Sequence, residues 1–151
     1  MRLAPCSAFA LVVLLLGAPL AQAADIGPVP PASDDLRTVR TLIEKKDWPA
    51  AVELLAAYTR TNPQNADSFN LLGYSYRHLK RYDESLTAYN RALTLNPRHR
   101  GAHEYIGEAY IQLGQFDKAK EHLDALNRLC FLPCEEYSDL KKSYEAALKG
   151  R

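Results

Sequence analysis

Cys130 and Cys134 are the side chains whose type and spacing suggest chemistry most directly. They enclose Phe131-Leu132-Pro133. Side chains at this spacing are poorly aimed for a disulfide in an unbroken helix, but a junction bent by Pro133 allows one. We expect a disulfide that ties the last helix to the preceding ones and contributes about 2 kcal/mol. Free buried thiols and a redox-active or soft-metal pair remain alternatives, although a thioredoxin-type motif has two intervening residues.

The histidines and carboxylates do not predict a metal centre or an active site. His99 and His103 are four residues apart, but His103 falls at a core position of a helical pattern and His99 falls in a turn. No carboxylate or cysteine completes a ligand set with them. Acidic pairs such as Glu135-Glu136 stand at expected helix starts, where capping and the helix dipole account for them. Without a phosphate-binding glycine loop or a Ser/His/Asp framework, we expect neither an enzyme nor a bound cofactor.

The elements that position these residues repeat every 34 residues. Asn62-Pro63 recurs as Asn96-Pro97, and Leu72-Gly73 recurs as Ile106-Gly107. Such an offset indicates stacked copies of one supersecondary unit. Four columns of similar residues show it: Trp48, Tyr82 and Phe116; Leu42, Tyr76 and Tyr110; Leu55, Tyr89 and Leu123; Ala51, Ser85 and Ala119.

Apolar residues at spacings of three and four predict two helices in each unit. Gly73 and Ser85 are small where two antiparallel helices must approach closely, because a large side chain would push the axes apart. Pro63 and Pro97 end the second helices of the first two units. The expected helices are Asp34–Lys46, Pro49–Thr61, Ala66–Leu79, Asp83–Leu95, Arg100–Leu113, Asp117–Leu129 and Glu135–Leu148.

These residues resemble the tetratricopeptide-repeat family, whose 34-residue unit carries a large-x-x-Leu-Gly-x-x-Tyr…Ala…Phe…Ala…Pro pattern. The middle unit, residues 66–99, carries most of that pattern, the third (100–133) departs at His103, Leu126 and Phe131, and the first (32–65) is degenerate. The resemblance implies an all-α solenoid of about three helix pairs. Residues 134–151 are expected to form a capping helix with a polar outer face. The matching positions of the middle unit are Phe69, Leu72, Gly73, Tyr76, Ser85, Tyr89, Ala92 and Pro97.

The first residues have the layout of a secretory signal peptide. Arg2 is followed by an apolar run, and Ala21-Gln22-Ala23 is a small-x-small cleavage site. The run is shorter than a membrane-spanning helix requires. We therefore expect a signal peptide over 1–23, an extended proline-rich lead-in over 24–31, and a periplasmic or secreted mature protein without a membrane span.

In this family, the first helix of each pair lines a concave groove, and the resemblance implies groove positions in this chain. We expect arginines there to meet acidic groups, Asn70 and Tyr74 to meet a peptide backbone, and glutamates to meet basic groups. The lysine and asparagine positions that clamp chaperone C-termini in some family members carry Leu36, Arg40, Leu71, Gly101 and Tyr105 here, so that specificity is not expected. The candidate groove residues are Arg37, Arg40, Asn70, Tyr74, Arg77, Glu104 and Glu108, with Leu36, Asp67 and Gln112 as further positions.

The formal net charge of +1 provides no basic surface for nucleic acid. The sequence therefore predicts a protein-interaction module, an adaptor or assembly factor for a protein or peptide partner. A redox or metal-handling accessory using Cys130 and Cys134, and a self-associating structural protein, are the alternatives; a homo-oligomer fits the second of these.

Overall fold

The structure, a computed structural model, describes residues 32–150. The predicted signal peptide and lead-in lie outside these residues. Among the described residues there are seven helices and no strands, so the predicted all-α class is confirmed. None of these helices is long and apolar enough to cross a membrane. The helices are α1 (Ala32–Glu44), α2 (Trp48–Thr61), α3 (Ala66–His78), α4 (Tyr82–Leu95), α5 (Arg100–Gln112), α6 (Phe116–Leu129) and α7 (Glu135–Lys149).

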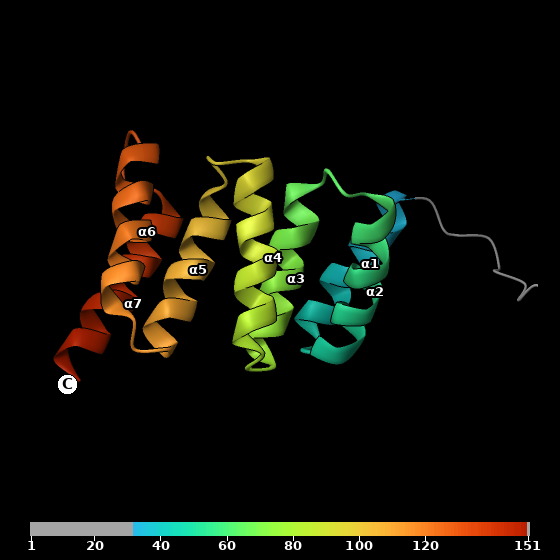
Figure 1. The fold of residues 1–151 in the computed structure, drawn as a ribbon, viewed down its shortest axis with the longest axis horizontal. Helices are drawn as coiled ribbons and strands as arrows, with labels where there is room; N and C mark the ends of the chain where they lie inside the picture. Colours follow the sequence, from blue (N-terminus) through green and yellow to red (C-terminus); the bar gives the residue numbers. More distant parts are fainter. Residues whose placement is uncertain (1–31, 151) are drawn as a thin grey trace, which may run out of the picture.

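The helices form a row of antiparallel pairs (Figure 1). α1 and α2 lie at one end, α3 and α4 in the middle, and α5 and α6 next to α7 at the other end. Helix bounds agree with the predicted ones to about two residues. The aromatic column of the repeat, Trp48, Tyr82 and Phe116, provides the first residue of the second helix in every pair.

Each pair is joined by the same tight turn. Lys46, Lys80 and Gly114 have positive φ angles of 58°, 60° and 70° and stand 34 residues apart. The residue after each one donates a backbone hydrogen bond to a carbonyl in the last turn of the first helix, as Arg81 does to Tyr76 at 3.0 Å. This left-handed C-terminal motif reverses the chain within three residues. Lys80 lies in this turn between α3 and α4, which is why the apolar pattern of the sequence is interrupted there by a polar residue.

Within the middle pair, small residues allow two helices to touch. Ser85 is fully buried and its hydroxyl donates a hydrogen bond of 2.8 Å to the carbonyl oxygen of Gly73. A Cβ atom on Gly73 would lie 2.5 Å from the ring of Tyr89, which is closer than carbon atoms can approach. The predicted reason for Gly73 and Ser85 is therefore correct. The adjoining core joins Val39, Leu55, Leu72 and Ala88 from the first four helices.

The last helix packs chiefly on α5. Leu140 of α7 is fully buried, and a Cβ atom on Gly107 would lie 2.5 Å from its Cδ2 atom. The 34-residue offset continues here, because Ile106 matches Leu140 and Tyr110 matches Tyr144. α7 thus caps the row as predicted, and it does so in the manner of the first helix of an incomplete fourth unit.

The contact between Gly107 and Leu140 makes a testable difference between two positions on α5. We expect Gly107→Leu to lower the free energy of unfolding by about 2 kcal/mol or more, because the new side chain overpacks the α5–α7 contact. Gln112→Leu, at an exposed position of the same helix, is expected to change it by less than about 0.5 kcal/mol. Urea denaturation followed by circular dichroism measures both, and equal effects would contradict this packing.

Candidate interaction face

A buried arginine connects the second and third helix pairs. Arg77 on α3 is only 7% exposed, and its Nη1 atom lies 2.7 Å from Glu108 Oε2 on α5. Its guanidinium carbon lies 5.5 Å from the ring centre of Tyr74 and 5.6 Å from that of Tyr105. A guanidinium is weakly hydrated and stacks on aromatic rings, so it tolerates this position better than a lysine ammonium would.

The rings around Arg77 extend toward the first helix pair. Tyr74 and Tyr105 are 4.9 Å apart between ring centres. On its other side, Tyr74 meets His78 at 4.5 Å, and His78 stacks on Trp48 of α2 at 4.1 Å with an interplanar angle of 7°. Burial, and then the nearby Arg77 and Lys46 charges, lower the pKa of His78. The ring is thus favoured in its neutral form, which suits stacking on an indole.

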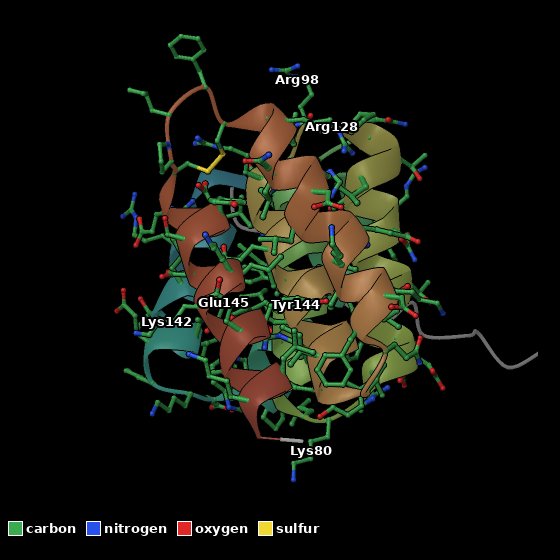
Figure 2. The ribbon with its side chains drawn as sticks, turned by 90° about the vertical axis from the view of Figure 1, so that its left-hand side faces the viewer. Lys80, Arg98, Arg128, Lys142, Tyr144 and Glu145 are labelled. Atoms are coloured by element: carbon green, nitrogen blue, oxygen red, sulfur yellow. A yellow bond between two sulfur atoms is a disulfide. The ribbon has the colours of Figure 1, made fainter. Side chains whose placement is uncertain are left out.

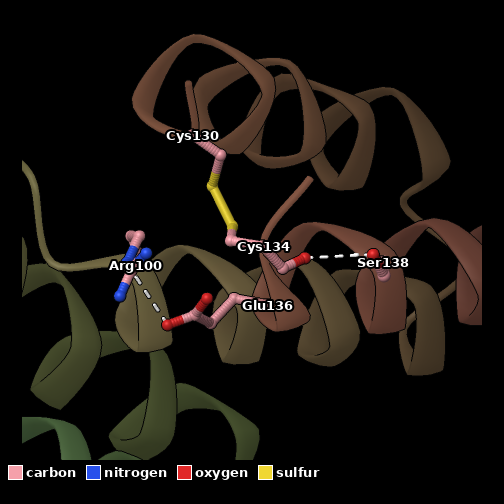
Figure 3. Close-up of a disulfide and its surroundings, with 5 residues drawn as sticks. All are labelled: Arg100, Cys130, Cys134, Glu136 and Ser138. Atoms are coloured by element: carbon pink, nitrogen blue, oxygen red, sulfur yellow. Dashed lines mark hydrogen bonds and ion pairs between the residues drawn. A yellow bond between two sulfur atoms is a disulfide. The ribbon is translucent and has the colours of Figure 1, made fainter. Parts of the chain in front are cut away.

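Carboxylates gather where α5 faces α7. Burial, together with the nearby carboxylates of Glu108, Asp139 and Glu136, raises the pKa of Glu104 to about 7, while Arg77 opposes the shift. A raised carboxyl pKa means that Glu104 adds stability below about pH 4.5, and that this stability is lost as the pH rises through 7. The cost of holding this charge at neutral pH makes Glu104 a candidate for contact with a positive group. Glu136 already has one, because Arg100 Nε lies 3.3 Å from its Oε1 atom (Figure 3).

Two cavities lie beside this surface. One of about 250 Å³ is lined by residues of α3, the start of α5 and α7, including Asp67, Arg100 and Glu136. A smaller one of about 120 Å³ lies between α5 and α7, beside Glu108 and Ser143. We name the surface between them the α3–α5–α7 face and define it by Tyr74, Arg77, Glu104, Tyr105, Glu108 and Asp139.

The structure unites some of the predicted groove residues and separates others. Tyr74, Arg77, Glu104 and Glu108 meet on the α3–α5–α7 face. Arg37 and Arg40 are exposed on α1, in the first pair, whereas the glutamates belong to the third.

The roles expected of three of these residues need correction. Arg77 was expected to bind an acidic group of the partner and Glu108 a basic one, but the two side chains form an ion pair with each other. Asn70 is 7% exposed, and its Oδ1 atom is buried without a hydrogen-bond partner in the part of the chain that the structure describes. It is therefore placed to pack against the start of α5, close to Gly101, and not to present its amide to a peptide.

Sequence reasoning missed Tyr105 and Asp139 as members of this face, and it missed that Trp48 adjoins the face through His78. Tyr105 precedes the core residue Ile106, so its aromatic side chain could have been assigned to the face beside Glu104. Asp139 could have been found from the repeat, because it lies 34 residues after Tyr105 and therefore occupies the equivalent position on α7.

Two histidines form a separate pair between α5 and α6. His103 Nε2 lies 3.1 Å from the carbonyl oxygen of Pro97, so this nitrogen carries the proton that it donates. Its Nδ1 atom must then accept from His122 Nδ1, which is 3.0 Å away. Burial, together with the nearby His103, lowers the pKa of His122 to about 4. No group of three or more His, Cys, Asp or Glu residues placed to hold a metal ion occurs within residues 32–150.

The two cysteines lie at the junction of α6 and α7. Cys130 and Cys134 are joined by a disulfide, with their Cα atoms 5.8 Å apart (Figure 3). Cys134 is the N-cap residue of α7, and its carbonyl oxygen accepts a hydrogen bond from Ser138 Oγ at 3.0 Å. The disulfide thus joins the end of α6 to the beginning of α7.

The repeated helix pairs, their identical turns and the face on successive first helices define a helical-repeat protein. Profiles described as tetratricopeptide repeat match residues 36–98 and residues 76–129. The chain belongs to the tetratricopeptide-repeat family.

Individual relatives are distant. Human protein O-mannosyl-transferase TMTC3 is 25% identical over 84 residues, which are 56% of this chain and 9% of that protein. The chain therefore spans only about a tenth of that relative's length. The complex of the TPR2B domain of yeast Sti1 with a pHsp70 partner has a TM-score of 0.73 at 20% identity, and the match covers 80% of this chain and 98% of that one. The Yersinia enterocolitica type III secretion chaperone SycD, in complex with a peptide of the translocator YopD, has a TM-score of 0.68 at 14% identity. This match covers 78% of this chain and 89% of that one.

The His103–His122 pair predicts a pH dependence. Because the folded-state pKa of His122 is about 4 and the unfolded value about 6.5, its contribution to stability is complete above pH 6.5 and is lost as the pH falls to 4. We expect this loss to be about 2 kcal/mol. His122→Asn keeps a hydrogen-bond donor and cannot titrate, so its unfolding free energy should fall less between pH 7 and pH 4. If the parent and variant lost stability in parallel between pH 7 and pH 4 in urea denaturation, the lowered pKa of His122 would be contradicted.

Proposed function

We propose that this protein is an interaction module that holds a segment of another protein against the α3–α5–α7 face. The observation that carries the proposal is the placement of Arg77. Buried between Tyr74 and Tyr105 and paired with Glu108, it holds aromatic rings from two helix pairs in one surface. A surface that is ordered before binding loses less conformational entropy when a partner arrives.

The chemistry of the accessible groups indicates the kind of segment. Tyr74 and Tyr105 are half-buried, so their rings provide apolar contact area with polar ends. Glu104 has a carboxylate that is costly to ionise, and Asp139 adds negative charge beside it. A segment that carries an apolar side chain followed by a lysine or arginine would satisfy both features. This replaces the mixed acidic and basic groove expected from the sequence.

Known structures of this fold support a binding role. The yeast Sti1 domain forms a complex with pHsp70, and the Yersinia SycD structure contains a peptide of the translocator YopD. Their similarity to this chain concerns the fold, and the identity of the partner is not transferred. The same applies to the transferase activity in the human relative's name, because only 9% of that protein is matched. A binding function, without catalysis, is what the face supports best.

We further propose that the protein works after export. The signal-like layout of residues 1–23 supports this, and a Cys130–Cys134 disulfide would persist in an oxidising compartment. Intact mass spectrometry of the protein from its native host should give a mature chain that begins at Ala24 and is lighter by two hydrogens than the dithiol form. A full-length chain in which Cys130 and Cys134 are both free thiols would contradict export.

A photo-crosslinking amino acid placed on the face tests the binding function. The analogue p-benzoylphenylalanine at Tyr105 should form covalent adducts with a host protein when cells are irradiated. Its matched control is Asn90, an exposed position on α4, which should give none. Adding Glu104→Arg to the Tyr105 variant should reduce the adduct at least fivefold, because the new charge repels a basic segment.

Equal crosslinking from both positions, or none from Tyr105, would contradict binding at this face. Circular dichroism of each variant verifies that the helices are intact.

A further inference from the structure

The α6–α7 junction exposes an apolar tip. Phe131 is 100% exposed and Leu132 is 72% exposed, whereas most large apolar side chains of the described chain are at least half-buried. The disulfide between Cys130 and Cys134 closes the short loop that carries them. Two apolar side chains are thus held out in solvent by a covalent constraint, and the contacts within one copy do not explain why.

An apolar pocket of about 550 Å³ lies elsewhere, between α3 and α4 of the middle pair. Phe69, Leu72, Tyr76 and Ala88 line it. The complete exposure of Phe131 shows that a copy does not fill its own pocket with its own tip. The tip lies after α6, at the end of the row opposite α1 (Figure 1).

The exposed charges near the tip are Arg98, Arg128 and Glu135, and the pocket rim offers an acidic partner for the arginines. Arg98 and Arg128 lie at the same end of the molecule as the disulfide (Figure 2). Both are exposed, and no ion pair of their side chains occurs among residues 32–150. The pocket rim carries Asp83 and Glu84. Glu84 is paired with Arg81, which leaves Asp83 as the rim carboxylate without an ion pair in the described part of the chain.

The remaining charge at the pocket is already engaged within its own copy. Arg91 donates a hydrogen bond of 3.0 Å from Nη2 to the carbonyl oxygen of Pro63, and its guanidinium lies over the ring of Phe69. The pocket therefore offers an apolar floor and an acidic side at Asp83, while Arg91 keeps its positive charge but is held over Phe69. Its volume is sufficient for a phenylalanine and a leucine side chain together.

From this complementarity we infer that the Phe131-Leu132 tip of one copy docks into the α3–α4 pocket of a second copy. Tip and pocket are different surfaces, so the contact is heterologous and leaves a tip and a pocket open at the two ends of each dimer. Longer head-to-tail assemblies then grow with concentration. Because two side chains carry the contact, its area is small and the association is weak.

Two variants disable the two surfaces separately. Phe131→Asp removes the tip at a side chain that is fully exposed, with Leu148→Asp as the control at another exposed apolar residue. Thr87→Arg places a long cation across the pocket mouth. Thr94→Arg is its control, because Thr94 is also exposed on α4 and makes the same backbone hydrogen bond as Thr87.

Sedimentation velocity of the purified protein from 10 µM to 1 mM tests the inference. The parent protein and both controls should sediment faster as concentration rises, and each disabled variant should remain monomeric, with association weakened at least tenfold. An equimolar mixture of Phe131→Asp and Thr87→Arg should form dimers and nothing larger, because only one intact tip and one intact pocket can meet.

A parent protein that is monomeric at 1 mM overturns the inference. A Phe131→Asp or Thr87→Arg protein that associates like the parent overturns it as well, and so does a mixture that stays monomeric.

Discussion

The burial of the Arg77 guanidinium between two helix pairs is the interaction on which the arrangement of the α3–α5–α7 face depends. A charge at 7% exposure is costly unless it is paired, and Glu108 provides the pair at 2.7 Å. The ring centres of Tyr74 and Tyr105 lie 5.5 Å and 5.6 Å from the guanidinium carbon. Since these partners lie on different first helices, the charge defines how α3 and α5 are placed relative to each other.

That interaction can form only because each pair is packed closely enough to bring successive first helices together. The absence of a side chain at Gly73 admits the ring of Tyr89, and Ser85 satisfies the carbonyl of the same glycine. Gly107 admits Leu140 in the same way, so α7 covers α5 and brings Asp139 to the face. Removal of either space would displace a helix, and with it the charges that the face presents.

The repeat pattern was sufficient to predict the helices, because proline, small residues and apolar stripes all mark the same boundaries. It could not show that Arg77 and Glu108 neutralise each other. A groove position indicates which face of its own helix a side chain occupies, but it does not give the distance between side chains on neighbouring helices. Nor could the repeat pattern show the burial of Asn70, which depends on how closely the start of α5 approaches α3. Lys46 and Lys80 adopt a left-handed conformation usually associated with glycine, and the aligned Gly114 was the one indication of it.

A double-mutant cycle on Arg77 and Glu108 tests most directly whether this charge pair determines the face. Arg77→Met, Glu108→Gln and the double variant are compared with the parent protein by urea denaturation. We expect a coupling free energy of about 1–3 kcal/mol, because either single change leaves the other charge partly buried without its partner. Effects that add to within about 0.4 kcal/mol would show that the two side chains act independently and would contradict it.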